Sequence, residues 1–472
     1  MEALSIKEIA MAVNGRVISG EENLSIKFVS TNSKAFSEGG LFVPIVGERF
    51  DGHNFINDAA LNGAKACFTH RELDYIDGMT YIEVDNTLNA LQSLGAYYRN
   101  KFNIPVIGIT GSVGKTTTKE MVSAALETRY KVLKTEGNMN SQVGLPLMML
   151  KLDSTHEIAV IEMGMSEEGE MERLAKIARP EVAIVTNIGV SHIAQLKTRE
   201  NIRKEKLNII NEFKEGSLLF VNGNDSLLQE IITNRSLDVS TPTREKLDLC
   251  KVITYGEGST YDYRASDIIF ADEKTSFTFN DSKEVINLSV LGMHNVYNAL
   301  AALAVAEHYH IPVSTSKEGL RNYSPIAMRG QILEVNGIKI IDDSYNASPD
   351  SMKSGIEVLK TLSGIKRKFA VLADIKELGE ISKQSHYEVG EFLVNQPIDG
   401  VITVGEEALE IAKALRDNNS LVNAYTFTNN EEVLKFLSGF LGAGDGVLVK
   451  GSRGMKTDEI VKGLTNPKEN LK

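Results

Sequence analysis

The sequence is poor in cysteine and in long apolar runs, and each shortage excludes a class of protein. Cys67 and Cys250 are the only cysteines in 472 residues, which is too few for a disulfide framework and gives no metal-ligand spacing. The longest apolar stretches, residues 145–150 and 299–306, fall short of the roughly 20 residues that cross a bilayer. The amino-terminal residues lack the sustained apolar core of a signal peptide. We therefore expect a cytoplasmic protein in a reducing compartment, without a membrane partner.

The chain also lacks a basic surplus, since 51 Lys and Arg residues face 63 Asp and Glu residues, a net charge of −12. A field of that sign repels polyanions, so we expect no nucleic-acid partner. The composition, 42% hydrophobic and 24% charged, is typical of a globular protein. At roughly 150 residues per domain, the length indicates about three domains. We expect a monomer.

The pattern of apolar segments divides the chain into three α/β domains, residues 1–100, 101–326 and 327–472. The first opens with a helix that Ser5 caps, with Glu8 completing a capping box. Gly15 is expected to end this helix. Short strands are expected at residues 25–29, 41–46 and 64–69.

In the second and third domains, apolar runs of strand length alternate with helical patterns. This alternation is typical of a parallel sheet covered on both faces. The expected central strands are residues 106–110, 158–162, 182–187 and 217–222, with an antiparallel patch within residues 267–290. The expected C-terminal strands are residues 339–343, 369–373, 401–404 and 447–450.

The segment GITGSVGKTTTKE, which starts at residue 108, places a glycine-rich turn between a strand and a helix. Glycines let backbone N–H groups curl around an anion, and the helix N-terminus adds positive potential. Lys115 can reach terminal phosphates and Thr116 can ligate magnesium. The spacing departs from the common GxxxxGK[ST] form, because Ile109 stands where that form has glycine. A structural loop is the alternative. The predicted contacts to nucleotide phosphates are Thr110, Gly111, Ser112, Val113, Gly114, Lys115, Thr116 and Thr117.

Glu162 and His192 follow two of the predicted central strands at their carboxyl ends, where ligands gather in open α/β sheets. Magnesium takes a few protein oxygens beside water and phosphate oxygens, so Glu162 and Thr116 can share one ion. A capping or solvated glutamate is an equally good interpretation of Glu162 alone. A lone histidine is more often packed or solvated than functional, so position alone favours a structural role for His192.

Four further residue types carry weaker signals. The charged helix RENIRKEKLNII contains Lys206, whose local interpretation is a solvated face, because a free lysine does not ligate a cation. Asn295 and Asn298 stand near the start of a helix, where amides can read a base edge, and Asp343 ends a strand, where a carboxylate can accept ribose hydroxyls. Arg329, at the junction of the two larger domains, can reach phosphates. The alternatives are a capped helix, a turn and an interface arginine.

Taken together, these segments resemble the Mur ligases of bacterial cell-wall synthesis, which use ATP to join amino acids to a UDP-sugar carboxylate. TGSVGKTTTKE is similar to the short phosphate loop of that family, in which the Walker glycine is also missing. The further matching segments, in family order, are TEGNMNSQVGLP, IEMG, HNVYNALAA, MRG, DDSYNASPDSM and VKGSRGMK. Within the family, LFVPIVGERFDGHNF, DDSYNASPDSM and ADIKELG resemble the members that add D-alanyl-D-alanine.

The resemblance implies a UDP-sugar domain at residues 1–100, a central P-loop ATPase domain at residues 101–326 and a Rossmann-like ligase domain at residues 327–472. It implies an ATP-dependent acid–amino-acid ligase that adds D-alanyl-D-alanine to UDP-N-acetylmuramoyl-tripeptide through an acyl phosphate, in peptidoglycan synthesis. The implied cofactors are ATP and two Mg²⁺ ions. The alternatives are a ligase that adds the third amino acid, a folylpolyglutamate synthase, and a nucleotide switch that makes no bond.

The resemblance also implies roles residue by residue. Lys115 would contact the β- and γ-phosphates, Thr116 and Glu162 would bind one Mg²⁺, and His192 would bind the second. Lys206 stands at the position of a carbamylated lysine, whose CO₂ adduct is a carboxylate-like metal ligand. The nucleotide site would be completed by Asn295, Asn298, Arg329 and Asp343. The substrate contacts would be Ser30, Thr31, Asn32, Ser33, Lys34, Gly47, Arg49, Asn138, Asn140 and Asn346.

One segment departs from the family pattern. The uridine-side motif usually reads Asp-Ser-Arg, and here the residues are Asn32, Ser33 and Lys34. The exchange removes an acid and replaces a bidentate guanidinium by a point charge. We therefore expect the affinity or orientation of the sugar nucleotide to differ from that of other members.

Overall fold

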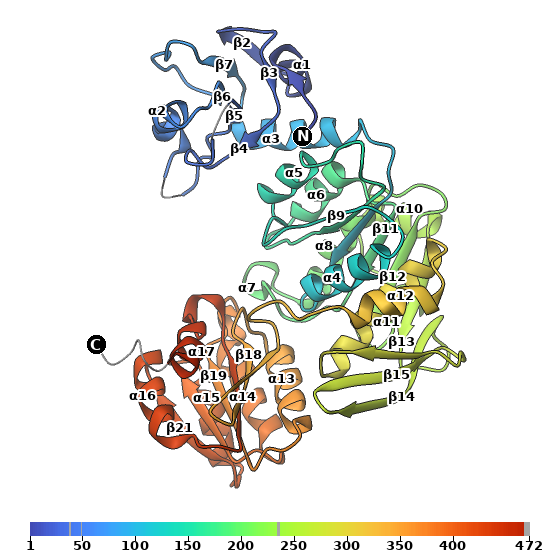
Figure 1. The fold of residues 1–472 in the computed structure, drawn as a ribbon, viewed down its shortest axis with the longest axis vertical. Coiled ribbons are helices and arrows are strands. Elements are labelled where there is room, and N and C mark those ends of the chain that lie inside the picture. The colour runs from blue at the N-terminus through green and yellow to red at the C-terminus, as the bar shows by residue number, and fades with distance from the viewer. Residues whose placement is uncertain (37–38, 49, 234–236, 467–472) are drawn as a thin grey trace.

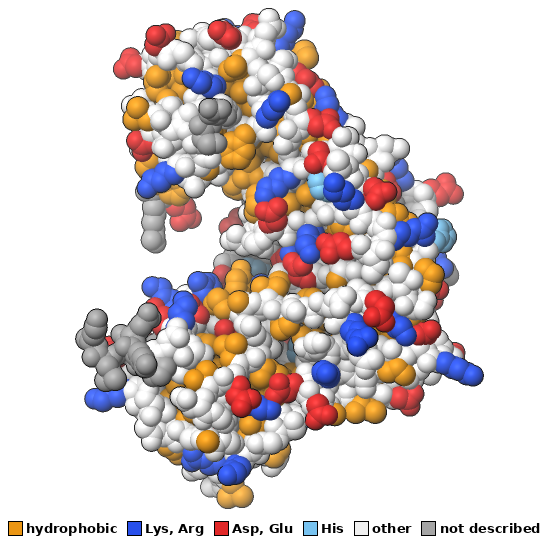
Figure 2. Space-filling view, in the orientation of Figure 1, with side chains coloured by type: hydrophobic (Ala, Val, Ile, Leu, Met, Phe, Trp, Pro, Cys, Tyr) orange, Lys and Arg blue, Asp and Glu red, His pale blue; other side chains and the backbone are white. Residues whose placement is uncertain are grey.

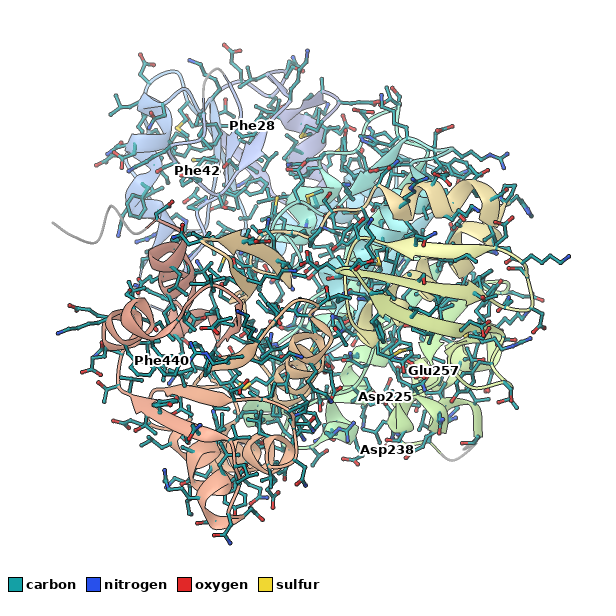
Figure 3. All side chains as sticks on the ribbon, turned by 60° about the horizontal axis from the view of Figure 1, so that its bottom comes forward. Phe28, Phe42, Asp225, Asp238, Glu257 and Phe440 are labelled. Atoms are coloured by element: carbon teal, nitrogen blue, oxygen red, sulfur yellow. The ribbon has the colours of Figure 1, made fainter. Side chains whose placement is uncertain are left out.

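The computed structural model describes residues 1–36, 39–48, 50–233 and 237–466. Three α/β domains follow one another along the chain, and Figure 1 shows them in a bent row with the second in the middle. Each has its own main sheet, as the apolar pattern predicts. One cluster of buried apolar side chains includes residues of all three domains, such as Leu4, Leu145 and Leu448. Aromatic pairs lie at the two ends of the row: Phe36 packs edge-on against Phe28 and Phe42 in the N-terminal domain, and Phe436 stacks on Phe440 in the C-terminal domain. Figure 3 labels Phe28, Phe42 and Phe440. In the described residues, no helix is both long and apolar enough to cross a bilayer.

The N-terminal domain carries a five-stranded sheet with the strand order β2-β7-β6-β5-β4. The strands are β2 (Arg16–Ser19), β4 (Val29–Ser30), β5 (Leu41–Phe42), β6 (Ala66–Thr69) and β7 (Thr80–Glu83), while β1 (Leu4–Ser5) pairs with β3 (Ser25–Ile26). The helices are α1 (Ile6–Ala12), α2 (Ile56–Leu61) and α3 (Thr87–Arg99). The strand predicted at residues 25–29 is two short strands, β3 and β4, in different sheets, and the strand predicted at residues 41–46 forms only over β5.

The capping box predicted for α1 is half correct. Ser5 accepts a hydrogen bond from the Glu8 N–H at 3.2 Å, so Ser5 caps the helix. The Glu8 carboxylate does not close the box, because it accepts from the Tyr97 hydroxyl at 2.8 Å and from Lys101 at 2.6 Å. The helix also ends before Gly15. Partners that are distant in sequence thus replace the local partner of Glu8.

Helix α3 joins the N-terminal and central domains. It packs on α5 (Gly144–Met149) and α6 (Glu170–Ala178) of the central domain. Arg99 at its end is buried and donates to the carbonyls of Ala178, Phe102 and Ile104 at 3.0, 2.7 and 3.0 Å. Because all three acceptors are backbone carbonyls, Arg99 fixes the linker to the central domain without a carboxylate partner.

The central domain is built on nine strands in the order β16-β15-β14-β13-β12-β11-β8-β10-β9. The pairings from β9 to β14 are parallel, and β14 to β16 form the predicted antiparallel patch. Strands β9 and β13 are additional to those predicted. The strands are β8 (Val106–Thr110), β9 (Val132–Lys134), β10 (Ile158–Glu162), β11 (Val182–Val185), β12 (Leu218–Asn222), β13 (Lys251–Gly256), β14 (Tyr263–Ala271), β15 (Lys274–Phe279) and β16 (Val285–Leu288).

Helices cover both faces of this sheet (Figure 1). The helices α4 (Lys115–Leu126), α11 (Met293–His308) and α12 (Val313–Arg321) pack together on one face. The other face carries α5, α6 and α8 (Arg199–Leu207). The remaining helices are α7 (Ile193–Leu196), α9 (Ser226–Thr233) and α10 (Thr241–Leu249). Since parallel strands end at one edge, the loop after β8 lies beside the ends of β10 and β11.

The C-terminal domain has a six-stranded sheet in the order β17-β18-β22-β19-β20-β21, which is parallel except for the edge strand β17. Four strands are those predicted, and β17 and β21 are additional. The strands are β17 (Gln331–Val335), β18 (Ile338–Asp343), β19 (Arg367–Ala373), β20 (Gly400–Val404), β21 (Asn423–Phe427) and β22 (Asp445–Lys450). The helices are α13 (Pro349–Thr361), α14 (Ser382–Leu393), α15 (Leu409–Asp417), α16 (Asn430–Phe440) and α17 (Asp458–Thr465).

Candidate active site

The loop between β8 and α4 has a backbone that only glycine allows at its first position. Gly111 has a φ of +149°, and a Cβ there would lie 1.9 Å from Thr186 Oγ1. Asn187 holds the next turn, because its carbonyl accepts from the Ser112 N–H at 3.0 Å and its side-chain oxygen accepts from the Val113 N–H at 2.9 Å. The predicted strand–loop–helix arrangement is therefore present, with a loop shape that the neighbouring strand end fixes.

Lys115 begins α4 and folds back over this loop. Its Nζ donates to the carbonyl of Gly111 at 2.8 Å, and the carbonyl of Ser112 lies 3.5 Å away. Burial lowers the pKa of Lys115 below its ordinary value, while Glu162 opposes that shift and Arg329 adds to it. The ammonium thus lies within the loop, where it can turn from backbone carbonyls to an anion.

Glu162 ends β10 and is only 2% exposed. Asn140 Nδ2 donates to its Oε1 at 2.7 Å, and the Asn138 carbonyl accepts from the Asn140 N–H at 2.8 Å. The other carboxylate oxygen, Oε2, is buried without a hydrogen-bond partner in the described residues. An unsatisfied buried carboxylate oxygen is costly, and a hard cation would satisfy it.

These residues fit a magnesium ion that is held partly by the protein and partly by the substrate. Thr116 is buried at the start of α4, directly after the loop, and offers a hydroxyl oxygen. In the described part of the chain, no three or more His, Cys, Asp or Glu side chains form a metal-binding cluster. A cation here would therefore take most of its ligands from water and phosphate oxygens, as Mg²⁺ commonly does.

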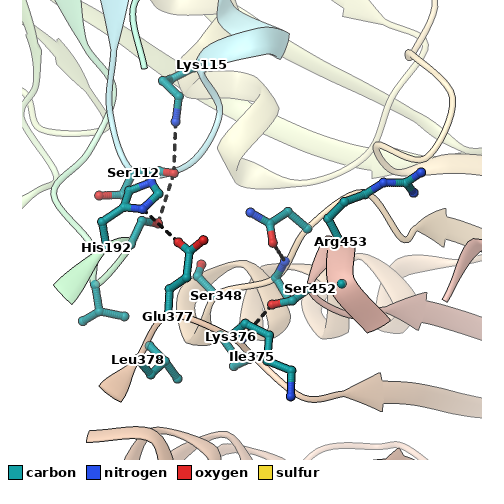
Figure 4. Close-up of a pocket in the computed structure, with 15 residues that line it drawn as sticks. Ser112, Lys115, His192, Ser348, Ile375, Lys376, Glu377, Leu378, Ser452 and Arg453 are labelled. Carbon is teal, nitrogen blue, oxygen red and sulfur yellow. Dashed lines mark hydrogen bonds and ion pairs between the residues drawn. The ribbon is translucent and has the colours of Figure 1, made fainter. Parts of the chain in front are cut away.

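His192 precedes α7 and faces the C-terminal domain. Its Nδ1 lies 2.8 Å from Glu377 Oε2 (Figure 4). Both residues have left-handed backbone, with φ of +63° and +67°, which is uncommon for residues other than glycine. His192 lowers the pKa of Glu377 below its ordinary value, and burial opposes this shift. The contact of Glu377 with His192 could not be read from the ADIKELG segment, because it crosses two domains.

Lys206 lies on the buried face of α8 and is 1% exposed, so the solvated-face interpretation is wrong for this residue. Its Nζ donates to the Gly111 carbonyl at 3.1 Å, the same oxygen that Lys115 Nζ contacts. Burial lowers the pKa of Lys206 well below its ordinary value, Lys115 lowers it further, and Glu205 opposes the shift. Both effects disfavour the ammonium form of this side chain and favour the nucleophilic free amine.

Asn295 and Asn298 are buried at the start of α11, where they bond to each other and to α4. Thr118 Oγ1 donates to Asn298 Oδ1 at 2.9 Å, and Asn298 Nδ2 donates to Asn295 Oδ1 at 3.3 Å. Asn295 Nδ2 donates to the Leu291 carbonyl at 2.8 Å. These contacts agree with a structural role, in which the amides pack one helix against another.

Arg329 and Asp343 each have a partner that sequence reasoning missed. The Arg329 guanidinium stacks on the Tyr345 ring, 4.0 Å from its centroid. Asp343 Oδ2 accepts from Nζ of the buried Lys450 at 2.6 Å, and Lys450 also donates to the Asn346 carbonyl at 3.0 Å. Neither contact could be read from the sequence, because Tyr345 and Lys450 each contribute through another side chain.

A pocket of about 170 Å³ lies between the phosphate loop and the C-terminal domain. Ser112, Lys115 and His192 line it from the central domain, and Lys376 and Arg453 line it from the other side (Figure 4). Cations from two domains thus meet around one small space. Such an arrangement suits a site where anions are brought together.

A second cavity of about 430 Å³ lies where the N-terminal domain meets the central domain. Thr31, Asn32 and Ser33 line it together with Phe50 of the same domain and Val143 of the central domain. Its wall is therefore mostly apolar with a polar turn at one side. This composition suits a flat, weakly polar ring with a hydrogen-bonding edge.

The turn at this cavity is held by its own side chains. Ser30 Oγ accepts from the Asn32 N–H at 3.0 Å, and Asn32 Oδ1 accepts from the N–H of the exposed Lys34 at 3.0 Å. Gly47 donates its N–H to the Phe50 carbonyl at 2.9 Å. Arg49, another expected substrate contact, lies outside the described residues.

Three family models match the chain and together cover most of it. They are the Mur ligase family catalytic domain at residues 25–136, the Mur ligase middle domain at residues 109–306 and the Mur ligase glutamate ligase domain at residues 328–453. The chain belongs to the Mur ligase family. The first and second matches overlap at the phosphate loop, and the third begins at the domain junction beside Arg329.

This Mur ligase is similar along its whole length to known relatives. The UDP-N-acetylmuramoyl-tripeptide–D-alanyl-D-alanine ligase of Bacillus subtilis is 38% identical over 463 residues, which are 98% of each chain. A crystal structure of MurF from Acinetobacter baumannii superposes with a TM-score of 0.88 at 29% identity, covering 98% of this chain and 99% of that chain. MurF ligase from Thermotoga maritima in complex with ADP gives a TM-score of 0.81 at 32% identity, covering 94% and 98%.

The structure of this Mur ligase brings only part of the predicted site together. Lys115 and Lys206 share one carbonyl, Glu162 acts on the pKa of Lys115, and His192 lines the same pocket as Lys115. The asparagines of α11 are buried against α4, and residues 31–33 line a cavity of the N-terminal domain. A substrate that reaches both cavities must therefore be long.

Proposed function

We propose that this Mur ligase joins D-alanyl-D-alanine to UDP-N-acetylmuramoyl-tripeptide with ATP, in the synthesis of peptidoglycan precursors. The observation that carries the proposal is the 38% identity to the Bacillus subtilis ligase of that name over 98% of both chains. The geometry agrees with it, because a phosphate loop, a buried carboxylate and a cation-lined pocket meet between two domains. The ADP complex of the Thermotoga maritima relative supports ATP as the nucleotide.

The proposed reaction activates a carboxylate, which by itself is a poor electrophile without a leaving group. The terminal carboxylate of the tripeptide attacks the γ-phosphorus of ATP, which releases ADP and forms an acyl phosphate. The amine of D-alanyl-D-alanine then attacks the acyl carbon, loses a proton and expels phosphate. Carboxylate and triphosphate repel each other, so the N–H groups of residues 110–117 and the Lys115 ammonium offset their charge and align them.

Mg²⁺, when bound, would supply positive charge that offsets the charge developing on the phosphate oxygens. The unpartnered Oε2 of Glu162 supports a site for one ion there, with the hydroxyl of Thr116 as a second protein ligand. His192 and a carbamylated Lys206 would hold the second ion. His192 Nδ1 faces Glu377 in the structure, so Nε2 is the ring nitrogen that would serve the ion while the Glu377 contact is kept.

The environment of Lys206 supports carbamylation. A neutral amine attacks CO₂ and loses a proton to form a carbamate, whereas an ammonium has no free electron pair. Burial lowers the pKa of Lys206 well below its ordinary value, which favours the neutral amine that this reaction needs. The carbamate would place a negative charge near Lys115. A protonated Lys206 would instead place a second positive charge there, which Lys115 would repel.

The N-terminal domain would hold the UDP-sugar in the cavity lined by residues 31–33. The aromatic ring of Phe50 and the apolar wall suit a pyrimidine, and the turn supplies backbone and hydroxyl groups. Asn32 Oδ1 accepts a hydrogen bond from the Lys34 N–H. This contact supports a structural rather than a ligand-binding role for Asn32, which replaces the acid of the family motif. Asn346, Arg329 and Asp343 would act from the C-terminal side.

The test is phosphate release with one substrate omitted at a time. We expect release only when ATP, Mg²⁺, UDP-N-acetylmuramoyl-tripeptide and D-alanyl-D-alanine are all present, and the Lys115→Ala variant should release none above background. Release with lysine or diaminopimelate on the UDP-dipeptide would indicate a ligase for the third residue, and release with glutamate on a folate would indicate a folylpolyglutamate synthase. Slow hydrolysis indifferent to any UDP-sugar would favour the nucleotide switch.

A further inference from the structure

The loop of residues 374–378, which follows β19, forms the C-terminal wall of the pocket between the two larger domains. Four of its members, residues 375–378, line that pocket. Glu377 contacts His192, and its carbonyl accepts from the Ala194 N–H at 3.2 Å. The position of this loop therefore sets how closely the C-terminal domain approaches the phosphate loop.

His386 on α14 anchors this loop from inside the C-terminal domain. Its side chain is fully buried. The Ile375 N–H donates to His386 Nε2 at 2.9 Å, and His386 Nδ1 donates to the Ser382 carbonyl at 2.7 Å. A backbone N–H only donates and a carbonyl only accepts, so these two partners require a neutral imidazole with its proton on Nδ1.

A second anchor holds the same loop independently. Ser452 Oγ accepts from the Lys376 N–H at 2.8 Å, and the Ser452 N–H donates to the Asp374 carbonyl at 3.3 Å. Loss of His386 would therefore free the Ile375 side of the loop while the Ser452 side stays attached. The loop would loosen without the domain unfolding.

We propose that His386 is a positioning residue, which holds the 374–378 loop against the reacting groups through the Ile375 N–H, and that protonation of His386 releases the loop and slows ligation. This inference rests on the proposed ligase function. His386 lines no part of the pocket, so its effect reaches the substrates only through the loop.

The direction of the pH effect follows from the surroundings of His386. Burial lowers its pKa below the ordinary value, the Ser382 carbonyl and the carboxylates of Asp374 and Glu407 oppose this shift, and Lys376 adds to it. The imidazole is therefore neutral, and the anchor intact, above the ordinary histidine value of about 6.5. As the pH falls further, a proton on Nε2 would leave His386 Nε2–H and the Ile375 N–H facing each other as two donors, so the hydrogen bond between them would be lost. Activity should then fall on the acid side.

Two variants separate the loss of the hydrogen bond that His386 accepts from the loss of the titration of its imidazole. His386→Leu removes the acceptor and should lower kcat/KM for D-alanyl-D-alanine by about tenfold, the usual order for one buried hydrogen bond. The KM for UDP-N-acetylmuramoyl-tripeptide should stay unchanged, because its cavity lies on the N-terminal domain. His386→Gln keeps an acceptor near Nε2 and does not titrate. It should keep most activity at pH 8 and retain a larger share of it at pH 5.5 than the unmodified protein.

Amide hydrogen exchange measured on the full chain without substrates supplies a readout that needs no reaction. At a single pH near 8, residues 374–378 should exchange faster in His386→Leu than in the unmodified protein, and His386→Gln should resemble the unmodified protein. The control is His308→Gln, which removes an exposed imidazole on α11 and should change neither the exchange nor the pH profile.

The outcomes are distinguishable. If His386→Leu matches the unmodified protein in exchange and rate, or if His386→Gln shows the same acid loss as the unmodified protein, the inference on His386 is wrong. If the unmodified protein releases no phosphate with D-alanyl-D-alanine, the proposed function is wrong. In that case unaltered exchange in His386→Leu would still refute the anchor, and faster exchange would confirm it.

Discussion

Lys206 is a buried lysine whose only hydrogen bond within the described residues goes to a backbone carbonyl. A charged amine is costly in such a site, and a carbamate would convert the repulsion from Lys115 into attraction. We predict that Lys206→Ala lowers kcat by about a hundredfold or more, the order found when one charge-stabilising group is removed. Added formate or acetate should restore part of the rate, since a small carboxylate can occupy the vacated volume. Steady-state rates against carboxylate concentration measure this.

The control for this experiment lies on the same helix. Lys204 is partly exposed, 3.7 Å from Asp238, so Lys204→Ala removes a lysine of α8 without touching the phosphate loop. It should keep a normal rate that carboxylates leave unchanged. A loss in Lys206→Ala that no carboxylate relieves, or no loss at all, would contradict the carbamate.

Glu162 is a second residue that the fold holds at a cost, because its Oε2 has no donor in the described structure. Glu162→Gln keeps the volume and removes the charge. We predict that half-saturation by Mg²⁺ rises by about tenfold or more, while the thermal unfolding midpoint stays equal or rises, as expected where an active site sacrifices stability. Rates over a Mg²⁺ titration and differential scanning calorimetry measure the two effects. Glu136→Gln, which removes the carboxylate of a surface ion pair with Lys151, should change neither.

At the scale of elements, two helical glycines separate the effect of side-chain packing on stability from that of helix propensity. Alanine is favoured over glycine in a helix interior by about 1 kcal/mol. At Gly319 of α12, however, a Cβ would lie 2.1 Å from the Ala124 carbonyl oxygen of α4 and 3.0 Å from Thr128 Cγ2. At Gly439 of α16, a Cβ would meet no described atom within 4 Å. The same substitution should therefore have opposite signs at the two sites.

We predict that Gly319→Ala destabilises the central domain by about 1–3 kcal/mol, the usual cost of overpacking. It should also lower ligase activity, because α4 begins at the phosphate loop. Gly439→Ala should raise the stability of the C-terminal domain slightly and leave activity unchanged. Denaturant unfolding followed by domain-specific probes measures both. An equal rise in stability for the two variants would show that α12 moves away from α4 without strain.

The sequence predicted those elements that form without distant partners. The four central strands and four C-terminal strands were found, because buried parallel strands read as apolar runs. Strands β9, β17 and β21 were missed, since each lies at the edge of its sheet and reads as a weaker apolar run. Strand β13 was also missed, although it lies inside its sheet. The capping role predicted for the Glu8 side chain was wrong, because its partners, Tyr97 and Lys101, are about 90 residues away in the sequence.

The candidate site also contains features that the sequence predicted and features that it did not. The loop at residues 110–117 and the position of Glu162 could be read from spacing, because both follow strand ends directly. The burial of Lys206 could not, since α8 is rich in charge and only its packing against α6 and α9 hides this residue. Glu377, Tyr345 and Lys450 act across the domain junction or through other side chains. Only the assembled fold shows these contacts.

At the scale of the whole molecule, the two cavities lie at different domain junctions. The cavity lined by residues 31–33 lies where the N-terminal domain meets the central domain, and the cation-lined pocket lies between the central and C-terminal domains. Figure 2 shows the surface hollowed between the first and third domains. If a UDP-sugar with a peptide tail occupies both sites, it links the N-terminal domain to the junction of the two larger domains. Domain approach should therefore depend on the complete substrate.

We predict that the radius of gyration, measured by small-angle X-ray scattering, falls when UDP-N-acetylmuramoyl-tripeptide and a non-hydrolysable ATP analogue with Mg²⁺ are added together. The acyl phosphate that forms in the reaction is sensitive to water, so the C-terminal domain must close over it before the amine attacks. UDP alone should leave the radius unchanged, because it fills the first cavity without reaching the second. Lys115→Ala should weaken the contraction by weakening the hold on the triphosphate. If the radius stayed constant with all ligands bound, the hollow would be a fixed feature and the two cavities would not serve one substrate.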